Sequence, residues 1–341
     1  MKKKILVTGG TGYIGSHTSV ELIEAGYDVV IIDNLYNSEA EVVDRIEKIT
    51  GVRPSLEVFD LCDKNKTDLF FKNNIDIAAI IHFAAYKAVG ESVRKPLEYY
   101  RNNLVSLMNI LNAMQDNSIW NMVFSSSCTV YGQPEKLPVT EEAPLQTAMS
   151  PYGNTKQIGE EIIRDTTISS DNIKAISLRY FNPIGAHPSA LIGELPRGIP
   201  ENLIPYITQT AIGLRDELSV FGDDYDTPDG SCIRDYLHVS DLAKAHVVAV
   251  KRLVEKKNKQ DYEVFNLGTG TGVSVLEAIH SFEKISGVKL KYKITGRRQG
   301  DIVKIWADPS LANSELGWKT SYSLDDSMRT AWEWEKQIRK Q

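Results

Sequence analysis

The chain of 341 residues carries a formal net charge of −6 at pH 7 and is 42% hydrophobic and 25% charged. This composition is ordinary for a globular protein of one large or two modest domains, and an acidic chain without a long basic run is not expected to bind nucleic acid. The apolar run after the basic residues 2–4 is too short for a signal peptide or a membrane span, which predicts a cytoplasmic protein.

The cysteine and histidine content limits the redox and metal chemistry. The three cysteines, Cys62, Cys128 and Cys232, lie far apart in the chain. An odd and sparse count fits a reduced, cytoplasmic protein without a disulfide framework. The six histidines form no close pair with the spacing of metal ligands, so no metal site is predicted.

A glycine-rich loop follows the first expected strand, at residues 3–7, and leads into a helix expected over residues 13–25. Gly10, Gly12 and Gly15 satisfy the pattern G-x-G-x-x-G. Glycines at these positions permit a tight turn, let backbone N–H groups approach a pyrophosphate, and let the helix pack on the strand. The loop between strand and helix therefore predicts a dinucleotide-binding site.

An acidic residue ends the second expected strand, at residues 29–32. Asp33 follows this strand, about 20 residues beyond the glycine loop, where a carboxylate can hold the ribose hydroxyls of NAD and repel the 2′-phosphate of NADP. Asn34 and Leu35 come next, so no arginine stands beside the acid in the sequence. NAD is therefore the predicted cofactor.

Strands and helices continue to alternate as far as Tyr180. Apolar runs predict strands at residues 55–59, 77–83, 121–126 and 174–180, and amphipathic patterns predict helices at residues 63–72 and 96–116. This rhythm is typical of an α/β fold with a parallel, doubly wound (Rossmann) sheet. Ligands of such sheets bind beyond the carboxyl ends of the strands, where Asp60, Phe83 and Ser127 stand.

The pattern changes after Tyr180, because proline and glycine become frequent and the elements become shorter. Helices are expected at residues 203–214, 239–255 and 274–286, and strands near residues 218–221 and 264–267. We therefore predict a Rossmann domain over residues 1–180, which carries the catalytic residues, and a smaller mixed α/β substrate-binding part over residues 181–341. The boundary is approximate, and the chain can cross back.

A tyrosine and a lysine stand four residues apart in the stretch from Ser150 to Lys156. At the start of a helix, Tyr152 and Lys156 would share one face. A free tyrosine titrates near pH ~10, and a neighbouring ammonium group favours the phenolate and lowers this pKa. The pair is therefore predicted to accept the proton of an alcohol that is being oxidised.

Taken together, these features resemble the extended short-chain dehydrogenase/reductase family. The glycine loop Thr8–Gly15, the strand end at Ser127 and the spacing of Tyr152 and Lys156 carry the resemblance. It extends over essentially the whole chain through the segments 82–85, 87–92, 96–100, 179–183, 185–188, 198–200, 234–236 and 266–268. Within the family, the chain most specifically resembles the members that act on UDP-glucose and UDP-galactose. The resemblance implies their reversible 4-epimerisation through a transient 4-keto sugar with tightly bound NAD, in galactose metabolism, by a homodimer.

The resemblance also assigns roles to individual residues. Tyr152 would be the catalytic base, Lys156 would tune it, and Ser127 would bridge Tyr152 and the sugar hydroxyl. The residues implied to bind the cofactor are Gly9, Gly12, Tyr13, Ile14, Gly15, Asp33, Asn34, Asp60, Leu61, Phe83, Ala84, Ala85, Lys87, Asn102, Ser127, Tyr152, Lys156 and Tyr180. The residues implied to bind the UDP-sugar are Ser127, Tyr152, Phe181, Asn182, Asn202, Leu203, Phe221, Arg234, Arg298, Asp301 and Ile305.

Two positions distinguish the chain from related dehydratases. Sugar-nucleotide 4,6-dehydratases carry an Asp-Glu pair where this chain has Cys128 and Thr129. Elimination of water from a keto sugar needs that acid and base, so dehydratase activity is not expected. Two alternatives stay open: an epimerase or other short-chain-dehydrogenase-type enzyme that acts on a different nucleotide sugar, and a dinucleotide sensor without catalytic activity.

The resemblance also places a gate beside the 2-substituent of the sugar, at Ile305. A tyrosine at this position tends to exclude N-acetylated sugars and a small residue tends to admit them, whereas isoleucine is intermediate in size and stiff. We therefore expect UDP-glucose and UDP-galactose to be preferred, with side activity on UDP-N-acetylglucosamine and UDP-N-acetylgalactosamine. The sequence equally allows Ile305 to pack only against a neighbour such as Tyr236.

Overall fold

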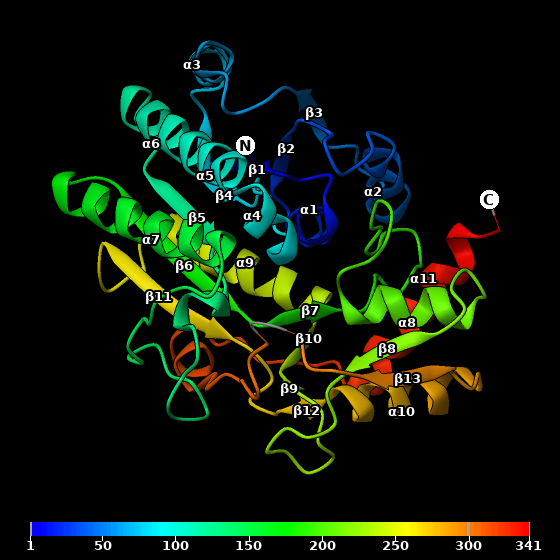
Figure 1. The fold of residues 1–341 in the computed structure, drawn as a ribbon. Helices are drawn as coiled ribbons and strands as arrows, with labels where there is room; N and C mark the ends of the chain where they lie inside the picture. Colours follow the sequence, from blue (N-terminus) through cyan, green and yellow to red (C-terminus); the bar gives the residue numbers. More distant parts are fainter. Residues whose placement is uncertain (1, 299–300, 341) are drawn as a thin grey trace.

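A computed structural model describes residues 2–298 and 301–340, and it is organised around one parallel sheet (Figure 1). The seven strands of this sheet lie in the order β11-β6-β5-β4-β1-β2-β3. They are β1 (Lys4–Thr8), β2 (Asp28–Asp33), β3 (Ser55–Val58), β4 (Ile77–His82), β5 (Asn121–Ser125), β6 (Lys174–Tyr180) and β11 (Tyr262–Leu267). The strand order reverses at β1, which β2 and β4 flank. This confirms the predicted doubly wound fold.

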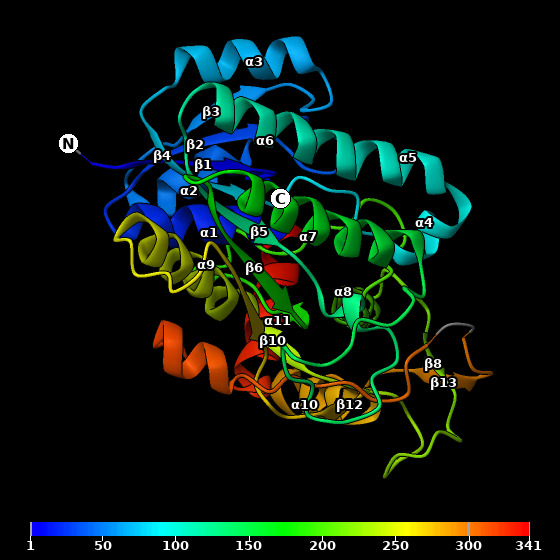
Figure 2. The same ribbon diagram turned by 90° about the vertical axis from the view of Figure 1, so that its left-hand side faces the viewer.

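Helices cover both faces of the sheet (Figure 1, Figure 2). One face is covered by α1 (Tyr13–Glu24), α2 (Val42–Thr50) and α9 (Val239–Val254). The other face is covered by α3 (Lys64–Asn73), α6 (Ser106–Asp116) and α7 (Pro151–Ser169). Both faces of the sheet are therefore shielded from solvent, as is usual for parallel sheets.

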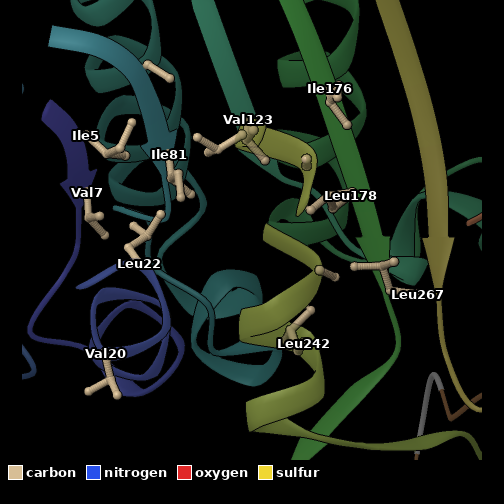
Figure 3. Packing of buried hydrophobic residues seen from close by; sticks show 14 of the residues in the cluster. Ile5, Val7, Val20, Leu22, Ile81, Val123, Ile176, Leu178, Leu242 and Leu267 are labelled. Carbon is tan, nitrogen blue, oxygen red and sulfur yellow. The ribbon is translucent and has the colours of Figure 1, made fainter. Parts of the chain in front are cut away.

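The side chains of the central strand β1 alternate between the two cores. Ile5 and Val7 belong to the core on the side of α1 and α9, with Val20 and Leu242 (Figure 3). Leu6 belongs to the opposite core, on the side of α3 and α6. All three β1 side chains are fully buried. Strands that are buried on both faces read as continuous apolar runs, which is why such runs predict them correctly.

A smaller part of the chain follows β6 and has its own core (Figure 2). Its strands are β7 (Asn182–Ile184), β8 (Leu218–Phe221), β9 (Ile233–Arg234), β10 (Tyr236–His238), β12 (Val273–Ser274) and β13 (Tyr292–Thr295), and its helical segments are α8 (Leu203–Ala211), α10 (Val275–Ser286), η3 (Ala312–Leu316) and α11 (Leu324–Ile338). The strands form the pairs β7–β10, β8–β13 and β9–β12. Ile207, Phe282 and Met328 join α8, α10 and α11 in the core.

The chain crosses back to the sheet after this part begins. Helix α9 packs in the same core as α1, and β11 pairs with β6 along its whole length, up to Leu267 beside Tyr180. We keep the division between residues 180 and 181 as a proposal, in which the segment 239–267 returns to the first part. Residues 1 and 341, the outer ends of the two proposed parts, lie outside the described residues.

One expected helix, at residues 96–116, has an irregular middle. It consists of α5 (Pro96–Tyr100), the π-helical turn η1 (Arg101–Val105) and α6 in direct succession. Within η1, the side chain of Asn103 donates to Thr155 Oγ1 on α7 over 3.0 Å. Such π turns occur mainly at functional sites, because they reorient side chains that a regular helix would turn elsewhere. The sequence patterns did not predict α2, α4 (Val89–Arg94) or α11.

Two classes of feature are not found in the described part of the chain. No helix within residues 2–298 and 301–340 is long and apolar enough to span a membrane. The same residues contain no group of three or more histidine, cysteine, aspartate or glutamate side chains that could hold a metal ion. The three cysteines are free thiols.

Candidate active site

One large cavity joins the carboxyl ends of the sheet strands to the smaller part of the chain. Its volume is about 1610 Å³, more than the ~300–1,000 Å³ of a typical small-molecule pocket, so it has room for a cofactor and a substrate together. The predicted site residues that line it are Gly9, Gly12, Tyr13, Ile14, Gly15, Asp33, Asn34, Asp60, Leu61, Phe83, Ala84, Ala85, Lys87, Asn102, Tyr152, Lys156, Tyr180, Asn182, Asn202, Leu203, Phe221, Arg234, Arg298 and Asp301. Ser127, Phe181 and Ile305 are not among the described residues that line it.

The glycine loop forms a cradle that larger side chains would fill. Gly9 has a φ of +70°, and a Cβ on it would lie 2.9 Å from the backbone nitrogen of Ala84. A Cβ on Gly15 would overlap the carbonyl oxygen of Gly9. The loop opens at the N-terminus of α1, where Gly12 supplies no capping side chain. Free N–H groups and the helix dipole at such an end suit a pyrophosphate, so these residues fit a dinucleotide.

Asp33 is held rigidly at the end of β2. It is 7% exposed, and its carboxylate accepts hydrogen bonds from the backbone of Thr11 and Leu35, at 3.2 and 2.9 Å, and from Ser38 Oγ at 3.1 Å. The bond to Thr11 ties the acid directly to the glycine loop. A carboxylate oxygen can accept further hydrogen bonds, so Asp33 fits the ribose hydroxyls that the sequence predicts for it.

The residues predicted to flank adenine, Asp60 and Leu61, line the cavity beyond the end of β3, and Phe83 lines it beyond the end of β4. Asp60 accepts a hydrogen bond from the backbone of Cys62 at 2.8 Å, and the carbonyl of Leu61 accepts one from Asn109 Nδ2 at 2.8 Å. Phe83 packs against His246, with ring centroids 4.6 Å apart. These contacts hold the strand ends in place and leave apolar surface for a planar ring.

Arg197 connects the two parts of the chain across the cavity, and the sequence did not indicate it. Its guanidinium donates to the carbonyl oxygens of Tyr36 and Ser38, at 2.7 Å each, in the loop that follows Asp33. Because both terminal nitrogens donate to carbonyls of this loop, Arg197 fixes the loop to the smaller part of the chain. We call these two hydrogen bonds the clasp. Its position does not weaken the prediction of NAD, which rests on the acid at Asp33.

The Arg197→Ala variant is expected to release NAD roughly tenfold faster than the unmodified protein, because an exposed arginine that donates to two carbonyls contributes about 1.4 kcal/mol. The measurement is the rate at which nucleotide appears in the ultrafiltrate after dilution. Arg329→Ala, which removes an exposed arginine from α11, is the control. Equal release rates for the two variants would contradict the clasp.

Tyr152 and Lys156 lie on the first turns of α7, as the spacing predicts. Ser150 caps this helix by accepting a hydrogen bond from the backbone of Gly153 at 3.1 Å, and Pro151 occupies the first helical position. Lys156 is 4% exposed, and its ammonium donates to the carbonyl oxygen of Ser125 at 2.5 Å. The ammonium nitrogen lies 5.9 Å from the centroid of the Tyr152 ring. The two groups are therefore close, but they do not form a direct hydrogen bond in the described residues.

Burial dominates the titration of this pair. It raises the pKa of Tyr152 well above its ordinary value, Tyr180 adds to this, and the Ser127 hydroxyl acts in the opposite direction. Burial also lowers the pKa of Lys156 to about 7, which Glu160 partly opposes. The pKa of Tyr152 is thus raised overall in the protein alone, where the spacing predicts a lowered pKa, because desolvation is the largest effect on the phenol.

Ser127 lies directly after β5 and is 7% exposed. Its hydroxyl caps the short helix η2 (Cys128–Tyr131) by accepting a hydrogen bond from the backbone of Thr129 at 3.2 Å. Ser125, two residues earlier, shares a 2.6 Å hydrogen bond with the hydroxyl of Tyr180. The hydroxyls of Ser127, Tyr152 and Tyr180 thus come from the end of β5, from α7 and from β6, and the Ser127 hydroxyl lies within hydrogen-bonding reach of Tyr152. Their proximity supports the predicted role of Ser127 although it does not line the cavity.

Glu194 gathers two of the predicted site residues, and the sequence did not indicate it either. Its carboxylate accepts from Lys87 Nζ at 3.0 Å and from Asn202 Nδ2 at 2.6 Å. Asn102, in η1, donates to Asn103 Oδ1 at 2.9 Å, and the backbone of Asn182 donates to Asp235. No local pattern could have identified the contact of Glu194 with Lys87, because the two residues are 107 positions apart in the sequence.

Besides Arg197, the smaller part contributes Arg234 and Arg298 to the lining of the cavity. Arg298 donates to Asp301 Oδ1 through Nε and one terminal nitrogen, at 3.1 and 2.7 Å, and Arg234 lies 3.9 Å from the same oxygen. The guanidinium of Arg298 also lies 5.4 Å from the ring centroid of Phe221. Two arginines against one carboxylate leave one positive charge in excess, which suits a diphosphate.

Phe181 and Ile305 lie behind the cavity wall. Both are 2% exposed and belong to one apolar cluster with Val130, Tyr131 and Ala307. Direct contact between a ligand and either side chain would need this cluster to open. Tyr236 belongs to a different core, so the cluster, and not Tyr236, surrounds Ile305.

The chain is similar over nearly its whole length to proteins of known family. The family model described as GDP-mannose 4,6 dehydratase matches residues 6–331. A protein of Dictyostelium discoideum named UDP-glucose 4-epimerase is 50% identical over 97% of this chain and 95% of its own, and one of Bacillus subtilis with the same name is 50% identical over 97% and 96%.

Solved structures agree with these relatives. A UDP-glucose 4-epimerase from Stenotrophomonas maltophila, with bound NAD and formylated UDP-arabinopyranose, superposes with a TM-score of 0.96 at 48% identity and covers 99% of each chain. One from Bifidobacterium longum, in complex with NAD⁺ and UDP, has a TM-score of 0.94 at 46% identity and covers 98% and 99%. The chain belongs to the GDP-mannose 4,6 dehydratase family of extended short-chain dehydrogenases/reductases and, within it, to the UDP-glucose 4-epimerases.

Proposed function

We propose that the chain is an NAD-dependent isomerase that interconverts UDP-glucose and UDP-galactose by inverting C4 through a transient 4-keto sugar, as in galactose metabolism. The observation that carries this proposal is the single cavity that joins the glycine cradle, Tyr152 with Lys156, and Arg234 with Arg298. The names of the relatives, and the NAD and UDP compounds bound in two similar structures, support the same cofactor and substrate class.

Each residue of the site has a role in this reaction. NAD⁺, which the glycine loop and Asp33 would hold, would supply a reversible hydride acceptor and a positive charge. Tyr152 accepts the proton of the sugar 4-hydroxyl, directly or through Ser127, and later returns it. Lys156 stabilises the phenolate by its charge. Arg234 and its neighbours hold the diphosphate, so that the keto sugar can turn over without leaving, and remote binding contacts thus serve the chemistry.

Proton NMR tests this function directly. UDP-galactose incubated with the purified protein and no added cofactor is expected to give the anomeric signal of UDP-glucose, because the reaction regenerates its cofactor. Parallel incubations with other nucleotide sugars separate an enzyme of different specificity from the proposed one. No conversion of any nucleotide sugar, with NAD found in the denatured protein, would leave only the dinucleotide sensor.

Arg234→Ala is expected to weaken UDP binding by ~2–5 kcal/mol, because the side chain is only 17% exposed and would leave a buried diphosphate charge without its partner. Calorimetric titration with UDP measures the loss. Arg215→Ala is the control, since Arg215 stacks on Tyr206 and does not line the described part of the cavity. An unchanged UDP affinity in Arg234→Ala would remove Arg234 from the proposed site.

We propose that Ile305 limits the size of the accepted sugar indirectly, through Ile302 in the cavity wall. Ile305 packs in the cluster that Ile302 also contacts, and Ile302 lines the cavity. A larger side chain at position 305 would therefore push the cavity wall inward. Side activity on N-acetylated UDP-sugars is proposed for the unmodified protein, with only partial discrimination, since one such contact contributes ~1–3 kcal/mol.

Ile305→Tyr is expected to suppress activity on UDP-N-acetylglucosamine while it spares UDP-glucose and UDP-galactose. The measurement is kcat/KM for both kinds of substrate. Ile305→Leu, which nearly conserves the volume, is the control. The same ratio of kcat/KM in the unmodified protein and in Ile305→Tyr would show that position 305 is not a gate.

Assembly and location complete the proposal. We propose a homodimer in the cytoplasm. Leu97, Met108 and Ile168 are exposed apolar side chains on α5, α6 and α7, helices that contact one another, and exposed apolar side chains on one helical layer favour self-association. Sedimentation velocity measures the assembly.

A further inference from the structure

Three consecutive serines stand at the end of β5, and the first two are held by different partners. The carbonyl of Ser125 accepts from Lys156 Nζ at 2.5 Å, and its hydroxyl is bonded to Tyr180. The hydroxyl of Ser126 donates to Glu160 Oε1 at 2.5 Å. Ser127 is the next residue, so the position of its hydroxyl depends on the two anchors that precede it.

Glu160 lies on the same helix as the catalytic pair. It follows Lys156 by one turn and Tyr152 by two turns of α7, so the three side chains share one face. It is 4% exposed and does not line the described part of the cavity. A carboxylate that is buried so completely, on the face that carries the chemistry, needs an explanation.

Arg179 compensates the charge of Glu160. Its guanidinium donates to the two carboxylate oxygens at 2.6 to 3.2 Å. It also donates to Tyr131 at 3.0 Å, and Tyr131 in turn donates to Asn266 at 2.6 Å. The network thus links four elements, which are α7, η2, β6 and β11.

We propose that Glu160 is a positioning residue of the reaction, which holds Ser126, and through it Ser127, in register with Tyr152, and which places a negative charge one helical turn from Lys156. This inference rests on the proposed function. It assigns Glu160 two separable effects: one through a hydrogen bond to the serine loop and one through charge.

The charge effect follows from the surroundings of Lys156. Burial lowers the pKa of Lys156, and Glu160 is the group that raises it. The neighbouring imidazole of His82 is buried and has a pKa lowered to about 3, so it stays neutral. The other titratable groups that face Lys156, Tyr152 or Glu160 are Tyr99 on α5, Cys128 on η2, Arg179 and Tyr180 on β6, and Tyr262 on β11. At ordinary pH, Arg179 alone among these is charged, and its charge is paired with the carboxylate of Glu160.

A purely structural ion pair elsewhere in the chain offers a matched control. Arg252 and Glu263 join α9 to β11 with bonds of 2.7 and 2.8 Å, and their side chains are 9% and 8% exposed. Neither residue lines the described part of the cavity. Glu263→Gln therefore removes a buried carboxylate beside an arginine without touching the catalytic face.

The test compares kcat against pH, and the midpoint of thermal unfolding, for the NAD-loaded protein and three variants. Glu160→Gln is expected to move the alkaline limb of kcat to lower pH by about 1 unit, because Lys156 then loses its proton more easily. Ser126→Ala is expected to lower kcat by up to about 100-fold through misplacement of Ser127, with the alkaline limb unchanged. Glu263→Gln is expected to lower the unfolding temperature and leave the pH profile as it is.

The outcomes separate the proposals. If Glu160→Gln lowers only the unfolding temperature, as Glu263→Gln does, Glu160 is structural and the inference is overturned. If Glu160→Gln does not fold, the double variant Glu160→Gln/Arg179→Met, which leaves no buried unpaired charge, is measured instead and must show the same alkaline shift. Glu160→Asp, which keeps the charge, is expected to restore the alkaline limb. Inactive unmodified protein would contradict the proposed function and not this inference.

Discussion

Replacing Tyr152 with phenylalanine is expected to lower kcat by ~10²–10⁴ while substrate binding stays nearly unchanged. The substitution removes the phenolic oxygen that accepts the proton and keeps the ring that packs at the start of α7. Tyr152 is only 8% exposed, so bulk water has little access to the place of the missing hydroxyl. The loss is therefore expected in kcat and not in the affinity for UDP-sugar.

Single-turnover and steady-state kinetics measure this change. Tyr262→Phe is the matched control, because Tyr262 is a partly buried tyrosine that donates to Ser177 Oγ at 2.9 Å and does not line the described part of the cavity. It is expected to keep its turnover. Near-normal turnover of Tyr152→Phe would show that another group, with Ser127 as the first to examine, takes the proton.

The free energy of unfolding is expected to fall steeply as the pH drops below about 6.5, because several buried histidines are neutral in the folded protein. Burial lowers the pKa of His17 and His82 to about 3 and of His238 and His246 to about 4. Each histidine binds its proton only in the unfolded chain between these values and 6.5. Their stabilising effect is thus complete above pH 6.5 and is lost as the pH falls.

The size of this effect is about 2 kcal/mol for each histidine at pH 5, so four of them are comparable to the ~5–15 kcal/mol stability of an ordinary protein. Glu21 acts in the opposite sense, because burial raises its pKa to about 7, but it is a single group and only partly buried. The net expectation is acid lability.

Urea denaturation at pH 5 to 8 measures how the free energy of unfolding changes with pH. His246→Leu is expected to flatten the pH dependence, because it removes one buried imidazole whose Nε2 has no partner among the described residues. His280→Leu, at an exposed position on α10, is the control and is expected to leave the slope unchanged. A slope that neither variant alters would exclude the buried histidines as its source.

Local patterns were sufficient for the Rossmann part of the fold. The apolar runs of β1 and β4 predict strands because both faces of the sheet are covered, and the glycine loop predicts the turn into α1 because only glycine tolerates the approach of Gly9 to Ala84. The hydrophobic pattern does not predict helix α11, although Ser323 and Asp326 form a capping box at its start. The signal was present there in the sequence.

The sequence by itself therefore determined the doubly wound fold, the acid at Asp33 and the shared helix face of Tyr152 and Lys156, since each depends on spacing within one or two neighbouring elements. The tertiary structure alone decided the rest. Arg197 and Glu160 meet partners that are distant in the chain, and Ile305 lies in a cluster behind the cavity. The pKa of Tyr152 rises where spacing predicted a fall, because desolvation depends on everything that is packed around the phenol and not on its nearest charge.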